Sequence, residues 1–552
     1  MAWHLQGTIF GQAVRLATGN KFFRYPDEID PSLWIKAVQQ ETPDDTPAQS
    51  AVVAGDSEKV IDGEEQSSSS NNQELQDDTE KASKTDVLLV GWYGPDDPEN
   101  PQNWPISLRH TIIAQLCLLN FSVYIASSMY TPGEGEFMKE FHVSEVVATL
   151  GLSLFTFGYG CGAMLWAPLS EMAKLGRSGI YFWTLLFFII FQLAVGFAPN
   201  APVFFVFRWV TGFLGSPCLS NGGGTVNDMY TPLMIPYLIC IWASAGICGP
   251  VFGPIIGGYI APAMGWRWTI WVFTWLNCSV LILMFFLSPE TSAANILYNR
   301  AKRLRKATGD DRLKSQSELD AAHHTRKDTY ILLSRAFMLT FTEPVIFLMN
   351  LYAGLLYGLL FLWFESFPIV FGGIYGFGIG SQGLVFLGIF IVAVFSMFGY
   401  LLWIKLQLIK KITGGNFKPE MVLPPMFVGG LALPICMFWF GWSSRSSIHW
   451  IMPIIGSGFF AIGVVTLFNS LFTYLGLTFT AYAGSVFAGA TLFRACFGAS
   501  FPLFARALFN KLGVAPGNSL LGALTILFIP VPYMFYFVSR LPLITFFYMM
   551  LN

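Results

Sequence analysis

The sequence predicts an all-α integral membrane protein with twelve membrane-spanning helices, arranged as two pseudo-symmetric six-helix bundles. Twelve strongly apolar stretches follow one another from Arg109 almost to the C-terminus, and a helix of about 20 residues crosses the roughly 30 Å core of a bilayer. Of the 552 residues, 54% are hydrophobic and 12% are charged, whereas soluble domains carry about 25% charged residues. One long charged segment separates the first six stretches from the last six, which predicts two halves.

Residues 1–108 are predicted to form an N-terminal tail that is largely disordered. From Glu41 to Thr85 the tail is acidic and polar, and such a segment buries too little apolar surface to fold. Between Trp92 and Trp104, prolines and glycines exclude a long helix, while the two tryptophans suit a membrane interface. A short amphipathic helix near the start is indicated by the spacing of apolar residues, namely Trp3, Leu5, Ile9, Phe10, Val14 and Leu16.

Twelve predicted spans follow the tail. The first bundle, residues 109–288, contains the spans 109–130, 146–168, 179–198, 202–224, 237–260 and 268–288. A polar central loop at 289–341 is rich in arginine and lysine. The second bundle, residues 342–538, contains the spans 342–364, 381–404, 421–441, 450–472, 482–504 and 518–538. Residues 539–552 form a C-terminal tail.

The distribution of arginine and lysine predicts the orientation, because loops that carry them stay in the cytosol. One side of the predicted spans carries the central loop and two further basic loops, which contain Lys174, Arg177, Lys405, Lys410, Lys411 and Lys418. The opposite side is left with Lys139, Arg267, Arg445, Arg506 and Lys511. We therefore predict a multi-pass protein with both termini in the cytosol.

The cysteines and histidines indicate neither a disulfide framework nor a metal site. The eight cysteines are scattered through the apolar stretches without a C-x-x-C pair, which favours a packing role. None of the six histidines lies deep in a span, so a membrane-embedded di-iron enzyme is disfavoured. Nothing in the sequence indicates a nucleic-acid partner, and nothing requires more than a monomer.

The fifth span contains the pattern G-x-x-x-G-P-x-x-G-G, formed by Gly249, Gly253, Pro254, Gly257 and Gly258. Glycines four residues apart leave a smooth helix face that a neighbouring helix can approach closely. Proline removes a backbone hydrogen bond and permits a kink. Generic tight packing explains single glycines, but the full pattern is much more specific than G-x-x-x-G.

An arginine, Arg208, lies inside the fourth span. An arginine at that depth is costly unless it is solvated or paired, so it is a functional candidate by default. The alternative is snorkelling of the side chain to the surface, because Arg208 is roughly 9 Å from the outer end of the span.

The tight loop between the second and third spans contains an acid and two bases, with Glu171, Gly176 and Arg177 as its characteristic residues. Such a loop bridges helix ends and can act as a conformational latch. Simple anchoring by the positive charges explains it equally well.

Together these motifs resemble those of the major facilitator superfamily, and within it the fungal twelve-span drug:proton antiporters. The Gly249–Gly258 run resembles that group's antiporter motif, and Arg208 with Gly212 resembles its fourth-span arginine motif. The loop motif is similar too, with Glu171 where most of the superfamily has aspartate. Further segments resemble the yeast benomyl and fluconazole resistance pumps, namely 92–104, 288–291, 364–371, 440–443 and 493–504.

The resemblance implies the major facilitator fold, with a substrate site near the midplane and alternating access by rocking of one half against the other. It also implies export of drugs, fungicides or toxic amphipathic molecules across the plasma membrane in exchange for protons. No phosphate-binding G-x-x-x-x-G-K-[ST] loop occurs, so ATP is not the expected energy source. No cofactor is expected, and the proton gradient is the energy source that the resemblance implies.

Three residues are predicted to couple transport to protons. Arg208 and Glu365 are the first candidates, and Arg494 is the weaker one. Glu365 lies at the outer end of the seventh span and Arg494 near the middle of the eleventh. For Glu365 the alternative is an ordinary carboxylate at the membrane boundary.

The candidate substrate-binding residues come from the first, seventh and tenth spans, which by resemblance line the cavity. They are Gln115, Asn120, Tyr124, Asn350, Tyr357 and Asn469. A largely apolar pocket with a few polar anchors suits amphipathic or planar aromatic compounds. Hydrogen bonding between helices is the alternative role for any single polar residue.

Two other functions stay open at this stage. A dedicated exporter of one endogenous secondary metabolite or toxin would have the same fold and motifs. A nutrient or polyamine uptake carrier is the other, but the Gly249–Gly258 motif argues against it because by resemblance the motif marks antiporters.

Overall fold

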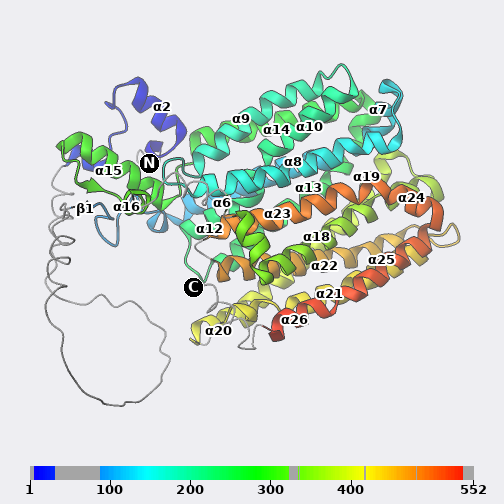
Figure 1. Ribbon diagram of the computed structural model, residues 1–552. Coiled ribbons are helices and arrows are strands. Elements are labelled where there is room, and N and C mark those ends of the chain that lie inside the picture. Colours follow the sequence, from blue (N-terminus) through cyan, green and yellow to red (C-terminus); the bar gives the residue numbers. More distant parts are fainter. Residues whose placement is uncertain are drawn as a thin grey trace, which may run out of the picture.

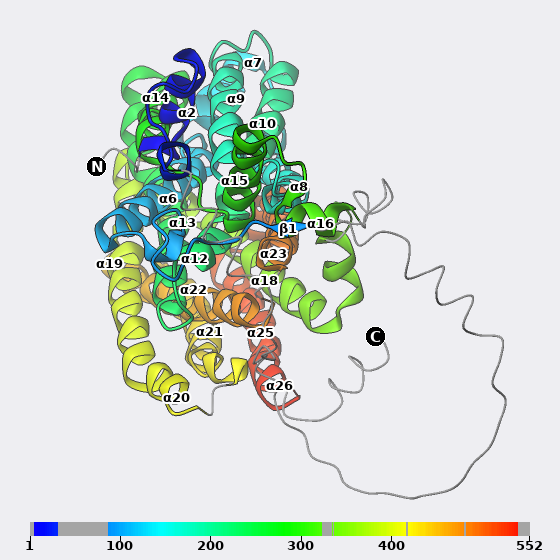
Figure 2. The ribbon, with the colours of Figure 1, turned by 90° about the vertical axis from the view of Figure 1, so that its left-hand side faces the viewer.

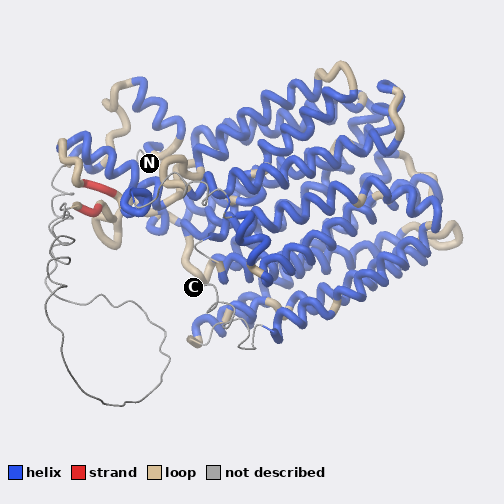
Figure 3. Tube along the Cα trace, viewed as in Figure 1, coloured by secondary structure: helices blue, strands red, loops and turns tan. Residues whose placement is uncertain are grey.

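The computed structural model describes residues 5–30, 87–322, 334, 336–415, 418–479 and 482–538. Helices make up nearly all of the elongated bundle (Figures 1 and 3). Among the described residues, eleven helices are long and apolar enough to cross a membrane, and one bent pair brings the number to twelve. The acidic segment from Glu41 to Thr85 and the tail at 539–552 lie outside the described residues.

The first half consists of six spans built from ten helical segments. These are α6 (Ile106–Ser128), η2 (Thr131–Gly133), α7 (Glu134–Phe141), α8 (Glu145–Glu171), α9 (Ser178–Gly196), α10 (Ala201–Gly215), α11 (Pro217–Ser220), α12 (Gly222–Met229), α13 (Ile235–Met264) and α14 (Trp266–Leu287). Each predicted span of this half overlaps one of these helices, and the fourth is divided among α10, α11 and α12.

The second half repeats this arrangement with more interruptions. Its segments are α18 (Pro344–Phe364), η3 (Pro368–Ile374), α19 (Ile379–Trp403), η4 (Ile404–Leu408), α20 (Ile409–Thr413), η5 (Pro419–Val422), α21 (Pro425–Ser443), α22 (Ile451–Thr478), α23 (Ala483–Ser500), α24 (Pro502–Leu512), α25 (Val514–Phe528) and α26 (Pro530–Val538). Four breaks in predicted spans have a proline as the first residue of the next helix, at Pro217, Pro425, Pro502 and Pro530. Proline ends a helix there because it lacks the N–H that the preceding turn requires.

The two halves lie side by side and meet along two helix pairs, α8 with α23 and α13 with α19 (Figures 1 and 2). Glycines bring these helices into close contact. A Cβ atom at Gly160 of α8 would lie 2.4 Å from the Cβ of Ala495 in α23. A Cβ atom at Gly383 of α19 would lie 2.4 Å from the carbonyl oxygen of Pro254 in α13. Small residues therefore set the spacing between the halves, as in other membrane helix pairs.

One end of the bundle, which we call the basic end, carries α15 (Ala293–Thr308), α16 (Gln316–Ala322) and α20 (Figure 1). The N-terminal segments α2 (Ile9–Ala17), α3 (Pro26–Ile29), β1 (Leu88–Leu89) and η1 (Pro101–Asn103) also lie there, and β1 pairs in parallel with β2 (Leu313–Lys314). The predicted amphipathic helix is confirmed by α2. Its Phe10 ring packs against Phe285 and Phe286 at the end of α14, with centroids 5.8 and 5.1 Å apart.

Buried ion pairs attach the tail to the central loop at the basic end. Arg300 of α15 is fully buried, and its Nη1 donates to Asp97 Oδ2 over 2.7 Å. Burial acts to raise the pKa of Asp97, but the hydrogen bonds and charge of Arg300 outweigh it, so the pKa is lowered. Arg303 pairs in the same way with Asp27 and Glu99, both at 3.0 Å. The described parts of the tail are therefore held in defined contacts.

Candidate functional site

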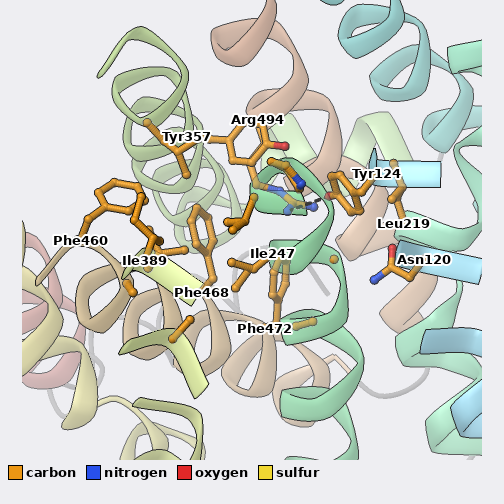
Figure 4. Close-up of a pocket in the computed structure, with 18 of the residues that line it drawn as sticks. Asn120, Tyr124, Leu219, Ile247, Tyr357, Ile389, Phe460, Phe468, Phe472 and Arg494 are labelled. Atoms are coloured by element: carbon orange, nitrogen blue, oxygen red, sulfur yellow. Dashed lines mark hydrogen bonds between the residues drawn. The ribbon is translucent and has the colours of Figure 1, made fainter. Parts of the chain in front are cut away.

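A cavity lies between the two halves (Figure 4). Helices α6 and α13 contribute lining residues from the first half, and α18, α19, α22 and α23 contribute from the second. Aromatic rings form much of its wall, namely those of Tyr124, Trp242, Tyr357, Phe364, Phe460, Phe468 and Phe472. We call it the central cavity. Its enclosure and apolar walls are typical of a site for a small organic molecule.

The polar groups of the central cavity gather around Arg494 (Figure 4). The Arg494 guanidinium donates to the Tyr124 hydroxyl over 3.4 Å and to Thr491 Oγ1 over 3.1 Å. It also lies over the ring of Phe472, 4.8 Å from the ring centroid. Nearby, the Tyr159 hydroxyl donates to the Tyr357 hydroxyl over 3.1 Å. Because these two tyrosines belong to different halves, this bond crosses the interface.

Three of the six predicted substrate-binding residues, Asn120, Tyr124 and Tyr357, line the central cavity. The other three, which are Gln115, Asn350 and Asn469, are not among its lining residues, and this part of the prediction is corrected.

Each of these three is buried in contacts between or within helices. Gln115 accepts a hydrogen bond from Ser288 over 3.4 Å, and Asn469 donates to Val465 of its own helix over 2.8 Å. Asn350 packs beside Gly489 of α23. The hydropathy of the sequence shows that a polar residue lies in a span. It does not show whether that residue faces a cavity or a neighbouring helix.

A second cavity is lined in part by residues of α7 and α24, two helices that lie at the end of the bundle away from the basic end (Figure 1). We call it the outer cavity. Pro250 and Phe364 belong to the walls of both cavities, so this proline and this ring separate them. Three charged residues line the outer cavity, namely Glu134, Glu365 and Arg506.

Arg506 connects two carboxylates at the outer cavity. Its Nε lies 3.2 Å from Oε2 of Glu365, the residue after the end of α18, and its Nη1 pairs with Glu145 at the start of α8. Arg506 in α24 thereby ties the two halves together at this end. Glu134 has 4% of its surface exposed, and within the described part of the chain one of its carboxylate oxygens has no hydrogen-bond partner. A buried carboxylate without a partner is costly as an anion.

Sequence reasoning missed Glu134, Glu145 and Arg506 as members of this cluster. It placed Arg506 after the end of the eleventh span and both glutamates between the first two spans. Short helices, α7 and α24, fold these segments back over the cavity. The signal in the sequence is the number of charged residues in the segments next to the apolar spans. By itself this signal indicates the orientation of the spans, but not which charged residues meet.

Arg208 is fully buried inside the first half and does not snorkel. Its Nε donates to the carbonyl oxygen of Gly151 and its Nη2 to that of Ala126, both over 3.0 Å. The guanidinium lies 4.7 Å from the centroid of the Phe155 ring. The described partners of Arg208 are thus backbone carbonyls and rings, whereas Glu365 pairs with Arg506.

The glycines of the fifth span face two different helices. Cβ atoms at Gly249 and Gly257 of α13 would lie 2.6 Å from Tyr124 Cβ and 2.4 Å from the Met129 carbonyl oxygen, at or beside α6. A Cβ at Gly258 would instead lie 2.9 Å from the carbonyl oxygen of Ile379, at the start of α19. Close backbone approach, which the sequence predicted for this motif, is confirmed. The motif contacts one helix of its own half and one of the other.

The loop after α8 links the halves at the basic end. The Glu171 carboxylate accepts hydrogen bonds from the backbone N–H and the hydroxyl of Ser485, over 3.3 and 3.2 Å. Ser485 is in the first turn of α23, where a helix favours an anion. The bond therefore connects α8 of the first half with α23 of the second.

The remaining loop residues build the first half itself. Gly176 has a φ of +70°, a backbone conformation that glycine adopts without strain. Arg177 Nε donates to Asp228 over 2.5 Å; burial lowers the pKa of Arg177, but this carboxylate outweighs it and raises the pKa overall. Glu290 accepts from the backbone N–H groups of Arg177 and Ser178 over 2.9 and 3.0 Å, and burial raises its pKa.

The comparisons with known proteins agree with this architecture. The family model described as Major Facilitator Superfamily matches residues 116–502. The chain belongs to this superfamily of transporters.

Two curated fungal relatives and one solved structure illustrate the match. The chain is 40% identical to fluconazole resistance protein 1 of Saccharomyces cerevisiae, over 83% of this chain and 84% of that protein. It is 37% identical to the citrinin biosynthesis cluster transporter mrr1 of Monascus ruber, over 83% and 92%. The proton:xylose symporter XylE shares the fold, with a TM-score of 0.57 and 14% identity over 77% of this chain and 96% of that one.

Proposed function

We propose that the protein is a proton-coupled efflux transporter that exports drugs, fungicides or other amphipathic small molecules across the plasma membrane by alternating access. The observation that carries the proposal is the aromatic central cavity between the halves, because transporters of this fold bind their cargo between their two repeats. One relative is named for resistance to fluconazole and another for a citrinin biosynthesis cluster, and removal of a compound from the cell accounts for both.

The basic end faces the cytosol in this proposal. Loops rich in lysine and arginine stay on the cytosolic side, and the described segments of the N-terminal tail and the end of α26 lie there (Figure 1). The Glu171 bond to Ser485 then closes the central cavity from the cytosol. The outer cavity becomes the path to the outside, beyond the ring of Phe364.

We assign the proton to the carboxylates of the outer cavity, with Glu365 as the principal carrier. When Glu365 is ionised it pairs with Arg506, and when it is protonated that attraction is lost. Arg506 is also paired with Glu145 of the first half, so a proton on Glu365 changes the charge balance of a contact between the halves. Arg208 acts as a positioning residue in this scheme, since it holds α6, α8 and α10 together through backbone carbonyls.

A dedicated exporter of one metabolite is the second candidate. The relative named for the citrinin biosynthesis cluster favours it. Both candidates use the same cavity and the same proton site, so they differ only in how many compounds the cavity accepts.

The test uses a yeast strain without its own drug pumps, which expresses the full chain. Efflux of the neutral dye Nile red is measured with and without a protonophore, together with azole and benomyl susceptibility. We expect gradient-dependent efflux, and we expect Glu365→Gln to abolish it while exchange of dye across a membrane without a gradient continues. Glu343→Gln, at the other end of the same helix, is the matched control. Unchanged driven efflux by Glu365→Gln at normal surface expression would contradict the proton assignment.

A further inference from the structure

We propose that the central cavity selects aromatic compounds that carry a carboxylate or another strong oxygen acceptor, that Arg494 binds this acceptor, and that organic cations are rejected. The inference deepens the proposed function and rests on it, because it names the class of compound that the efflux cavity takes.

Arg494 has polar partners, but none of them neutralises its charge. Its three described hydrogen bonds go to the Ala490 carbonyl oxygen at 3.3 Å, the Thr491 hydroxyl and the Tyr124 hydroxyl. All three acceptors are neutral oxygens, and the bond to Tyr124 is long at 3.4 Å. A guanidinium has more N–H donors than these bonds use. Donors therefore remain available to a molecule in the cavity.

Arg494 is also the one charged residue among those that line the central cavity. The carboxylates nearest to the cavities, Glu134 and Glu365, line the outer cavity instead. Among the described residues, no aspartate or glutamate forms an ion pair with Arg494. A buried arginine without a counter-charge is costly within a membrane, and a bound anion would supply the missing charge.

The same charge disfavours a cation. Attraction and repulsion between charges grow as the surroundings become less polar, and the walls of this cavity are largely rings and aliphatic chains. A cationic compound would face Arg494 with no carboxylate in the cavity to offset the repulsion. An acceptor oxygen gains from the same surroundings, because hydrogen bonds to a charged donor are the stronger ones.

The rings around Arg494 set the geometry of recognition. The guanidinium lies 4.8 Å from the Phe472 centroid, 5.6 Å from that of Tyr357 and 5.9 Å from that of Phe468. Because these rings contact the guanidinium, an acceptor atom of the ligand has to approach the N–H groups of Arg494 at the edge of the guanidinium plane. The body of the ligand then lies against the remaining aromatic wall, to which Phe364 and Phe460 belong.

The test compares three dyes in inside-out plasma-membrane vesicles from the pump-deficient yeast, with an acidic interior. Fluorescein and rhodamine 123 share a fused ring system but carry opposite charge, and neutral Nile red reports on the pump itself. We expect proton-driven uptake of Nile red and fluorescein, and no uptake of rhodamine 123 beyond that of vesicles without the protein. Arg494→Gln is expected to lower fluorescein uptake about tenfold or more relative to Nile red uptake by the same variant, since it removes hydrogen bonds from a charged donor. Arg494→Lys is expected to recover part of the fluorescein uptake.

Arg445→Gln is the matched control, because Arg445 is an exposed arginine in the connection between α21 and α22. Absence of Nile red uptake by the unaltered protein would count against the proposed function. If Nile red is transported but rhodamine 123 is taken up as fast as fluorescein, the substrate class is wrong. Equal loss of Nile red and fluorescein uptake by Arg494→Gln, at normal amounts of folded protein, would make Arg494 a structural residue and would also overturn the inference.

Discussion

Substitution of Gly257 by alanine tests whether close contact between α13 and α6 sustains the fold and the transport cycle. The new methyl carbon would lie 2.4 Å from the carbonyl oxygen of Met129 and 3.3 Å from its carbonyl carbon. Ordinary contacts begin at 3.4 Å, so the two backbones must separate by about 1 Å at this point. Overpacking of this kind typically costs about 1–3 kcal/mol.

Substitutions at two further glycines allow the expected loss of stability to be compared with the available space. At Gly253 the nearest atom to a new methyl carbon is Ser128 Oγ, at 2.0 Å, and a side-chain oxygen can rotate away; the nearest backbone atom, Met129 N, is at 2.9 Å, farther than the backbone oxygen at Gly257. Gly430 of α21 has no atom within 4 Å of the corresponding position, so Gly430→Ala is the matched control. We expect the loss of stability to be largest for Gly257→Ala, smaller for Gly253→Ala and absent for Gly430→Ala.

The assay is thermal unfolding of the detergent-purified full chain, paired with Nile red efflux in the pump-deficient yeast. Efflux should fall in the same order, because α13 contacts both α6 and α19 and has to move with its own half. Equal melting temperatures for Gly257→Ala and Gly430→Ala would refute the steric reasoning.

Three other substitutions follow from the contacts. Asp97→Ala leaves the buried Arg300 with its longer ion pair to Glu99, at 3.4 Å, and should cost up to about 3 kcal/mol, seen as faster proteolysis of the tail. Since the pKa of Asp97 is lowered, the stabilisation is present at neutral pH and is lost on acidification. Glu171→Gln should weaken the bond to Ser485 and raise passive dye leakage from the cytosolic side. Phe364→Ala removes a ring that separates the two cavities and thereby joins them. This substitution should raise the KM for dye efflux severalfold without loss of surface expression.

The positions of the spans could be predicted from the sequence, because lipid contact is a local requirement on each helix. Each predicted span overlaps a helix, and two of them are interrupted where Pro217 and Pro530 start a new segment. The close contacts of the α13 glycines could be predicted for the same reason. The absence of a side chain is a property of the residue itself.

The partners of the charged residues could not be predicted. The sequence predicts Arg208 and Glu365 as proton-coupling residues without naming their partners. In the structure Arg208 donates to backbone carbonyls of its own half, and Glu365 pairs with Arg506. The rotation of each helix about its axis decides such pairings, and in an almost uniformly apolar span the sequence contains little periodic signal for that rotation. For the same reason the sequence analysis predicted Asn350 and Asn469 as cavity residues, whereas neither lines the central cavity.

By itself, then, the sequence determined the membrane class, the two halves, the approximate spans and the family, because these depend on composition and on short motifs read along the chain. Only the tertiary structure decided that Arg494 lies in an aromatic cavity without a counter-charge and that Glu134, Glu365 and Arg506 gather in a separate one. The physical reason is that both clusters join residues more than a hundred positions apart. The pair of Glu365 and Arg506 forms only once the helices of the second half have packed, and the contact of Arg494 with Tyr124 only once the two halves have packed together.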